Sequence, residues 1–283
     1  LVVCEDGSFH GSVSGGCVEG AVVLEALEIL TDGTCKVLEY GVNDVDAFAV
    51  GLACGGTIKI MVEPVGFGQG VAVETLEALA QAYTDRLGLG LQVNLQTWAR
   101  AVITPQTHGQ DFIGLGGVSE QIYTHIQNPP LRLVVVGAVH IAQFLTPMAQ
   151  LVGYQVTIID PRESFASPQR FPDQELIVDW PEDALAELAI DNRTALVTLT
   201  HDPKMDTPSL QAALETEAFY IGALGSTRTH AKRRTSMLDL GVSVAQFDRI
   251  QGPVGLSIGS KSPAEIALSI LAAITQCLRV PSP

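Results

Sequence analysis

The sequence predicts an α/β protein with two domains: an N-terminal α+β domain with glycine-cysteine turns, followed by a Rossmann-like domain built on a doubly wound parallel sheet. Three observations lead to this fold class. A buried strand, a glycine turn and a helix follow one another between residues 131 and 160. Apolar strands and helices continue to alternate after residue 160, as in doubly wound folds. Residues 1–62 instead combine short strands with glycine turns that contain cysteine.

The segment 131–160 is predicted to form one βαβ unit. Its first strand is the continuous apolar run from Leu133 to Val136, which ends at Gly137. The next residues place apolar side chains at helical spacing until Gly153 ends the helix. A second apolar strand then runs from Gln155 to Ile159 and is followed by Asp160.

The turn after the first of these strands matches the glycine pattern of dinucleotide-binding proteins only in part. It contains Gly137 and His140, but Val139 occupies the position where a second glycine lets the backbone approach a pyrophosphate. Asp160 occupies the position of the acidic residue that binds the ribose, about 20 residues after the turn. An NAD(P) site is therefore one alternative for this domain.

Length and composition restrict the class of protein. A chain of 283 residues suggests two domains, and 47% hydrophobic with 17% charged residues is typical of a protein with a substantial core. The net charge of −15 argues against binding to nucleic acid or to anionic membranes. No apolar run reaches the roughly 18 residues that a membrane span requires. Five cysteines without disulfide-like spacing favour a cytoplasmic protein. Since the chain starts at Leu1 without a methionine, we expect further residues before it.

The first glycine-cysteine turn lies in the segment Ser12–Glu19, which leads from a short strand into a helix. The predicted apolar face of that helix consists of Val18, Val22, Leu27 and Leu30. Gly16 and Cys17 then lie at the helix N-terminus, where the unpaired N–H groups and the helix dipole favour a thiolate and also suit Glu19. Alternatively, Cys17 is a small apolar residue that fills a tight turn.

The second turn contains Cys54, Gly55 and Gly56 and precedes a strand at 57–62, in which Ile58, Ile60 and Val62 share one face. Neither turn has the C-x-x-C spacing of a structural zinc site. If the fold brings Cys17 and Cys54 together, they form a sulfur-rich pocket suited to a soft metal or its sulfur ligands. Alternatively, the glycines only turn the chain. The other cysteines are predicted to be core or incidental residues: Cys4, Cys35 and Cys277.

A helix is predicted within 71–87, with an apolar face of Val73, Leu76, Leu79, Ala80, Tyr83 and Leu87. Strands are predicted at 91–98 and 101–103, and His108 is interpreted as a loop residue. The segment Gln127-Asn128-Pro129-Pro130 cannot continue a helix, so we place the boundary there. The predicted domains are residues 1–127 and 128–283.

In the second domain, polar residues follow the carboxyl ends of several predicted strands, which is the edge where doubly wound sheets bind ligands. Arg162 lies in the loop after Asp160, and the strand 195–199 is followed by Thr200-His201-Asp202. Those three can also be ordinary loop residues before a helix that Thr207 caps and Pro208 begins.

A basic helix start follows the predicted strand 219–222. Gly225, Ser226 and Arg228 open this helix, and three further cations follow at 232–234. In such an acidic chain this arrangement favours an anion site, in which backbone N–H groups and arginine receive a phosphate. The alternative is a solvated helical face. A last strand is predicted at 255–259, and Ser262 and Glu265 form a capping box for the final helix.

Taken together, these motifs resemble the XdhC/CoxI family of accessory proteins for xanthine dehydrogenase and related molybdenum hydroxylases. The resemblance spans nearly the whole chain and is weakest between about residues 65 and 128. It rests on these segments: GSVSGGCVEG at 11–20, LACGG at 52–56, VVVGAVHIA at 134–142, IIDPRE at 158–163, THD at 200–202, YIGALGS at 220–226 and GPVGLSIGSKSPAEIALSI at 252–270. In the usual glycine-alanine-glycine-histidine turn of the family, this chain has Val139 in place of the second glycine.

The resemblance implies a maturation factor and not a metabolic enzyme. Such a protein binds the molybdenum cofactor (molybdopterin), shields it while a cysteine desulfurase supplies sulfur for its sulfido ligand, and delivers it to a xanthine dehydrogenase-type molybdoenzyme. A homodimer is plausible. The expected cofactor-binding residues are Gly16, Cys17, Cys54, Gly55, Gly56, Gly137, His140, Asp160, Arg162, Gly225, Ser226 and Arg228, with Cys17 and Cys54 facing the metal.

Two alternatives remain at the level of the sequence. An NAD(P)-dependent oxidoreductase with His140 or His201 as proton donor would explain the fold and Asp160, but not the cysteine turns. The second alternative is a scaffold that bridges the desulfurase and the hydroxylase without binding the cofactor.

Overall fold

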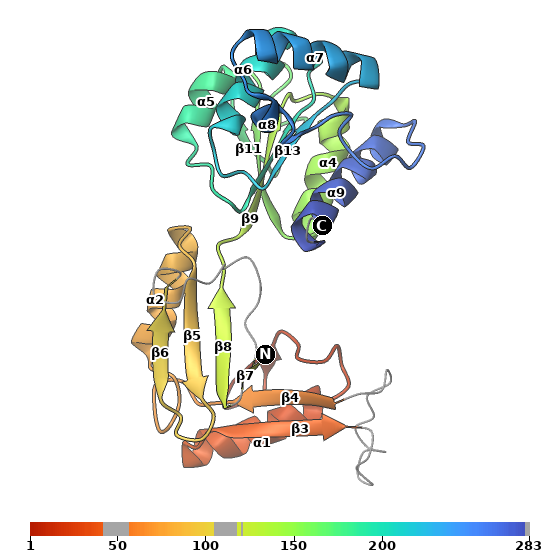
Figure 1. Ribbon diagram of the computed structural model, residues 1–283. Coiled ribbons are helices and arrows are strands. Elements are labelled where there is room, and N and C mark those ends of the chain that lie inside the picture. The colour runs from red at the N-terminus through yellow and green to blue at the C-terminus, as the bar shows by residue number, and fades with distance from the viewer. Residues whose placement is uncertain (42–56, 105–117, 120, 281–283) are drawn as a thin grey trace. The chain divides into compact units, whose positions relative to one another are not determined.

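The computed structural model describes residues 1–41, 57–104, 118–119 and 121–280 (Figure 1). The chain divides into two compact units, Leu1–Pro129 (unit 1) and Pro130–Pro283 (unit 2). Among the described residues, every helix is too short or too polar to cross a membrane.

Unit 1 is an α+β unit whose described residues form three small antiparallel sheets. One sheet pairs β1 (Val2–Val3) with β2 (Phe9–His10), and another pairs β3 (Lys36–Gly41) with β4 (Thr57–Val62). The third has the order β6-β5-β8-β7, made of β5 (Leu89–Asn94), β6 (Arg100–Ile103), β7 (Val118–Ser119) and β8 (Ile122–Gln127). The helices among its described residues are α1 (Glu19–Asp32) and α2 (Val73–Thr84).

The β4 strand separates two apolar clusters of unit 1. Ile60 is buried with Val18 and Val22 of the α1 region, and Ile58 and Val62 pack against the same cluster. The predicted alternation along this strand is therefore confirmed. Met61 points the other way and packs against a second cluster, formed by Val71, Leu79, Leu91 and Val93.

The apolar face predicted for the first helix was partly wrong. The buried positions of α1 are Val22, Ala26 and Ile29, together with Glu19. Leu27 and Leu30 are only half-buried. The buried positions follow the 3.6-residue period from Val22, whereas Leu30 lies beside that face and Leu27 points well away from it.

The next predicted helix is shorter than the segment 71–87, and its buried face is narrower. α2 ends at Thr84 and buries Leu79 and Ala82, whereas five predicted core positions are exposed: Val73, Leu76, Ala80, Tyr83 and Leu87. The following strand, predicted to reach Trp98, ends at Asn94. The side chain of Asn94 accepts hydrogen bonds from the N–H groups of Gln96 and Thr97, which turns the chain.

Unit 2 is a doubly wound α/β domain, which confirms the predicted fold class. Its six strands lie in the order β11-β10-β9-β12-β13-β14, and all neighbours are parallel. This is the order of dinucleotide-binding domains, with the chain reversing direction across the sheet between β9 and β12. The strands are β9 (Leu131–Val136), β10 (Tyr154–Ile159), β11 (Glu175–Ile177), β12 (Thr194–Thr198), β13 (Tyr220–Ala223) and β14 (Ile250–Gln251).

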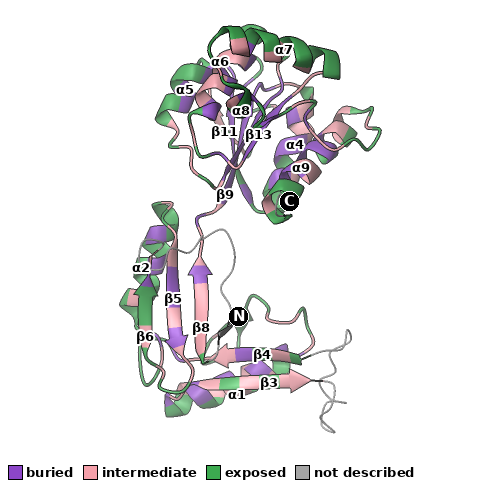
Figure 2. Ribbon diagram, viewed as in Figure 1, coloured by how far each residue is buried: buried purple, intermediate pink, exposed green. Residues whose placement is uncertain are grey.

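Helices cover both faces of this sheet, and the strand β9 is buried along its whole length (Figure 2). On one face, α4 (His140–Leu151) and α9 (Pro263–Arg279) pack side by side, as Figure 1 shows. The other helices pack against the opposite face: α5 (Pro181–Glu187), α6 (Pro203–Leu214), α7 (Thr227–Asp239) and α8 (Val244–Phe247). The predicted strand-turn-helix-strand order of 131–160 is confirmed.

One helix boundary in unit 2 differs from the prediction. The helix α6 starts at Pro203, not at Pro208, because Asp202 and not Thr207 is its N-cap: the Asp202 carboxylate accepts a hydrogen bond from the N–H of Lys204 at 3.0 Å. Pro208 lies inside the helix.

The last strand of the sheet is β14, and the segment 255–259 is not a strand. Gly255 and Gly259 have φ values of 95° and 78°, which are incompatible with an extended chain. The predicted capping box at the start of α9 is confirmed, since Ser262 and Glu265 each bond the backbone N–H of the other.

Candidate functional site

The first glycine-cysteine turn is organised around the carboxylate of Glu19. One oxygen, Oε1, accepts hydrogen bonds from the Ser12 hydroxyl at 2.5 Å and from the N–H groups of Val13 and Ser14 at 3.1 and 2.9 Å. The other, Oε2, accepts from the Ser14 hydroxyl at 2.8 Å and from the N–H of Gly16 at 3.0 Å. These donors hold the pKa of Glu19 well below its ordinary value, with the Ser12 hydroxyl as the largest cause.

Gly15 and Gly16 give this turn a shape that other residues adopt only under strain. Their φ values are 77° and 109°. No atom outside the turn would come within 4 Å of a Cβ at either position. Glycine is therefore favoured here by the positive φ angles and not by a lack of space for a Cβ atom. The backbone of both residues borders open space.

Cys17 directly precedes the N-cap of α1, Val18, as the sequence predicts. Its side chain is half-buried and packs against the cluster of Val18, Val22 and Ile60, so it partly fills the turn and partly faces outward. Its N–H donates to the Ser14 hydroxyl oxygen at 3.1 Å. Both interpretations of Cys17 are compatible with this geometry.

The remaining cysteines differ in their surroundings. Cys54, Gly55 and Gly56, like His108, lie outside the described residues. Cys4 and Cys277 are exposed, whereas Cys35 is buried and its thiol donates to the Gln69 carbonyl at 3.2 Å. Burial raises the pKa of the Cys35 thiol. In the part of the chain that the structure describes, no three His, Cys, Asp or Glu side chains are grouped as metal ligands.

In unit 2, the predicted site residues lie along one edge of the sheet. Val136 pairs with Thr198, and Thr198 pairs with Ala223, so the turns that follow β9, β12 and β13 leave the sheet at the same level. The structure thus brings Gly137 and Gly225 to a common edge with His201, which has a φ of 61°.

Gly137 is required by packing at this edge. Its φ is 107°, and a Cβ at this position would lie 2.6 Å from Cγ2 of Thr200. The turn after β9 therefore closes directly against the end of β12. Val139, the N-cap of α4, packs its side chain against the core and offers no side-chain cap, which leaves the first N–H groups of the helix without that partner.

Asp160 is fully buried and binds protein groups with both carboxylate oxygens. It accepts from the N–H of Ala138 at 2.8 Å and from Nε and Nη2 of Arg162 at 2.8 and 2.7 Å. Burial raises its pKa, but the hydrogen bonds from Arg162 and Ala138 outweigh burial, so the pKa lies below the ordinary value. This geometry and Val139 do not support the NAD(P) alternative, in which Asp160 would bind a ribose.

Cationic side chains surround the first turn of α4. His140, its first residue, is exposed. The guanidinium carbon of Arg162 lies 3.8 Å from the centre of the Phe165 ring. Arg170 donates to the carbonyl oxygens of Ala138 and Phe165, both at 2.7 Å. No pattern in the sequence indicated Arg170, because its partners lie 32 and 5 residues away in loops.

The start of α7 has the predicted form. Gly225 has a φ of 143°, and Ser226 caps the helix by accepting from the N–H of Thr229 at 3.1 Å. Arg228 is exposed, as is Lys232.

Arg233 differs from the other cations of α7. Only 8% of its side chain is exposed, and its Nη2 donates to the Leu224 carbonyl at 2.9 Å and lies 3.6 Å from the Asp206 carboxylate. Asp206 also accepts from the Thr200 hydroxyl at 2.7 Å, and burial raises its pKa. Of the four cations that the sequence places around this helix start, Arg233 is therefore paired within the protein, where it joins α7 to α6.

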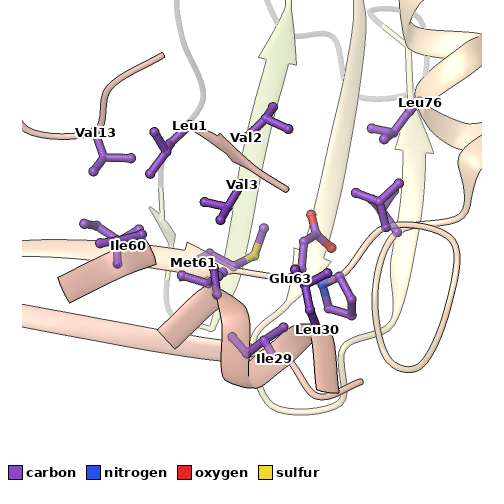
Figure 3. A pocket seen from close by; sticks show the side chains of 16 residues that line it. Leu1, Val2, Val3, Val13, Ile29, Leu30, Ile60, Met61, Glu63 and Leu76 are labelled. Carbon is purple, nitrogen blue, oxygen red and sulfur yellow. The ribbon is translucent and has the colours of Figure 1, made fainter. Parts of the chain in front are cut away.

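Unit 1 also contains a largely apolar pocket that the sequence did not indicate. Its volume is about 580 Å³, and its walls come from β1, α1, β4 and α2 (Figure 3). The Glu63 carboxylate lies among apolar side chains such as Leu30 and Met61. Since Glu63 pairs with Arg100, the pocket offers little free charge.

Comparison with known proteins gives a consistent assignment. Residues 133–274 match the XdhC Rossmann domain, and residues 1–41 match the XdhC and CoxI family. The chain is 32% identical over 274 residues to the molybdenum cofactor insertion chaperone PaoD of Escherichia coli K12, and the match covers 97% of this chain and 76% of that protein.

Two further similar proteins support the same family assignment. A probable xanthine dehydrogenase subunit of Bacillus subtilis is 26% identical over 284 residues, covering 94% of this chain and 83% of that protein. A crystal structure described as a xanthine dehydrogenase from Bacillus halodurans superposes with a TM-score of 0.78 at 27% identity, covering 99% of this chain and 86% of that one. The match of both units, together with the turn at Cys17 and the sheet edge at Gly137, confirms the resemblance: this chain belongs to the XdhC/CoxI family.

Proposed function

We propose that this protein is a chaperone that binds the molybdenum cofactor as cargo and delivers it to a xanthine dehydrogenase-type molybdoenzyme. The observation that carries the proposal is the cationic edge of the unit 2 sheet. In a chain of net charge −15, Arg162 follows β10 and the exposed Arg228 lies in the first turn of α7 at this edge, beside the N-termini of α4 and α7. An anionic cargo would be repelled elsewhere and attracted there. Similarity to a molybdenum cofactor insertion chaperone supports the same conclusion.

At this edge, the start of α7 would hold the phosphate of the pterin. Ser226 and the first N–H groups of α7 provide donors, and Arg228 provides a charged partner. Gly225 keeps the turn close to the helix. Arg162 and His140 would contact the cargo from the neighbouring turn, while Gly137 and Asp160 would act indirectly by fixing that turn.

In unit 1, Cys17 and Cys54 would face the metal end of the cargo, with Gly16, Gly55 and Gly56 leaving room beside them. Two observations support this assignment. The backbone at Gly16 borders open space. Cys17 packs in the same cluster as Ile58 of β4, and Cys54 precedes the first residue of β4 by three positions in the sequence. Thiol groups are suitable partners for a soft metal and its sulfur ligands.

Two finer parts of the proposal concern partners. A cysteine desulfurase would supply the sulfur for the sulfido ligand while the cofactor is bound, and the protein would act as a homodimer. Pull-down of the desulfurase and sedimentation of the purified protein test these parts separately.

The proposal is tested by purifying the protein from cells with active cofactor synthesis and quantifying molybdenum and pterin per chain. We expect the wild type to carry both, and Cys17→Ser to carry clearly less. Cys4→Ser is the matched control, because Cys4 is also a free thiol of unit 1 but is exposed and lies in another turn. Wild-type protein without molybdenum or pterin would contradict the proposal, and full loading of Cys17→Ser would remove this thiol from it.

A further inference from the structure

The loop before α1 encloses a carboxylate of its own chain. Five hydrogen bonds from the segment 12–16 converge on Glu19, three from backbone N–H groups and two from serine hydroxyls. Successive N–H groups arranged in this way form a binding site for an anion. Here the anion is Glu19, the first residue of α1, and only 8% of it is exposed.

This arrangement has a consequence for the cargo. The N–H groups of Val13, Ser14 and Gly16 already have a charged partner, so they are not donors for a phosphate. Charged acceptors form stronger hydrogen bonds than neutral ones, so the loop is held in one shape before any cargo binds. Preorganisation of this kind is what a binding site requires from the residues around it.

The network reaches Cys17 through Ser14. The Ser14 hydroxyl donates to Oε2 of Glu19 at 2.8 Å, and its oxygen accepts from the N–H groups of Cys17 and Val18 at 3.1 and 3.0 Å. Because one hydroxyl is donor to Glu19 and acceptor from Cys17, the position of the Cys17 backbone depends on the carboxylate two residues later.

We propose that Glu19 is a positioning residue, which holds the turn so that the thiol of Cys17 faces the cargo. The identity of the cargo in this inference rests on the proposed function. The claim that Glu19 fixes the position of Cys17 rests only on the hydrogen bonds described above. Glu19 itself does not touch the cargo, because its carboxylate is enclosed by the loop.

The first test measures the alkylation rate of Cys17 by iodoacetamide in the cargo-free full chain, by mass spectrometry of the peptide. The exposed Cys277 of unit 2 provides the internal reference. In Glu19→Gln, an amide NH2 group replaces one of the two carboxylate oxygens. It cannot accept hydrogen bonds from the donors of the loop, so we expect the turn to open. We expect the Cys17 rate, relative to Cys277, to rise by roughly fivefold or more.

Glu74→Gln is the matched control, because Glu74 also lies in the first turn of a helix of unit 1 but is exposed. It should leave the Cys17 rate unchanged. Ser14→Ala is the second variant: it keeps the carboxylate and its backbone donors and removes only the hydroxyl that joins Glu19 to Cys17. It should also raise the alkylation rate of Cys17. This variant keeps the test decisive if Glu19→Gln fails to fold.

The second test measures molybdenum and pterin loading. Glu19→Gln should load as poorly as Cys17→Ser, and the double variant should load no worse than either. An unchanged Cys17 rate in both Glu19→Gln and Ser14→Ala overturns the inference, whatever the loading. A loss of loading in Glu19→Gln that Cys17→Ser does not share also overturns it. By contrast, a wild type without cargo contradicts the proposed function and leaves the alkylation result intact.

Discussion

Asp160 shows how a residue at a ligand-binding position can act on the protein instead. Its carboxylate bonds Ala138 in the turn after β9 and Arg162 in the loop after β10, so it joins the two loops at the sheet edge. Because its pKa in the folded protein lies below the ordinary value of 3.8, the charged form stabilises the fold.

A pH dependence follows from this shift. The stabilisation is fully present above the unfolded pKa, near pH 4, and is lost as the pH falls through the lower pKa of the folded protein. We expect the free energy of unfolding of the wild type to fall in this acid range. In Asp160→Asn, whose side chain cannot titrate, the fall should be shallower. Chemical denaturation from about pH 6 down to about pH 3, across the titration of a carboxyl group, measures both. Equal slopes would contradict the assigned role.

Gly137 allows a second test at the residue scale. Alanine there combines a positive φ with a contact of 2.6 Å to Thr200, whereas Gly153, with a φ of 91°, has open space around the Cβ position. Gly137→Ala should lower the free energy of unfolding by about 2–3 kcal/mol, and Gly153→Ala by only about 1 kcal/mol. Thermal or urea unfolding compares them. An equal loss of unfolding free energy in the two variants would contradict the prediction, because it would mean that Thr200 moves aside at no cost.

At the scale of the elements, α7 carries one arginine that stabilises the fold and another that is proposed to bind the cargo. Its buried Arg233 pairs with Asp206 of α6, and its exposed Arg228 lies in the first turn. Removing one partner of a buried pair leaves the other charge uncompensated, so Arg233→Ala should cost about 3 kcal/mol of stability. Arg228→Ala should change stability by less than about 0.5 kcal/mol and should instead reduce cargo loading.

Unfolding curves and molybdenum content of the two variants check this pair of predictions. Arg279→Ala, in the last turn of α9, is the control for the loss of an exposed cation elsewhere in unit 2. Loading that falls equally in Arg228→Ala and Arg279→Ala would indicate a general charge effect and not a site on α7.

The sequence predicted those elements whose signals are local. The apolar run of β9, the turn at Gly137 and the capping box at Ser262 all act within a few residues, and all are confirmed. The predicted start of α6 was wrong because two Pro-containing starts compete in sequence, and the Asp202 cap prevails. The segment 255–259 has the composition of a strand, but its glycines adopt positive φ values.

The side chains around the candidate site were harder to predict because their partners are not fixed by spacing. Glu19 was expected only to suit the helix dipole, whereas its partners lie in the preceding loop. Arg233 shares its sequence surroundings with exposed cations, and only the packing of α7 on α6 selects it for burial. Asp206 and Arg170 have roles that depend on residues brought close by the fold.

The whole molecule combines an acidic chain, a sheet edge with exposed cations and a preorganised cysteine turn, three features that suit a carrier of an anionic cofactor. Attraction between exposed charges is screened by salt, with a Debye length of about 8 Å at physiological ionic strength. We therefore expect release of the cargo to accelerate as salt is raised, and less so in Arg228→Ala than in the wild type. Equilibrium dialysis of loaded protein at several salt concentrations measures this, and release independent of salt would argue against the cationic edge.

The most direct test of the carrier function is transfer of the cofactor to the apo form of a xanthine dehydrogenase-type molybdoenzyme. Loaded protein and an equal amount of free cofactor are each mixed with the apoenzyme, and the recovery of hydroxylase activity is followed over time. We predict faster and more complete recovery with the loaded protein, and less with loaded Cys17→Ser. Recovery that is equally fast with free cofactor would contradict a carrier function.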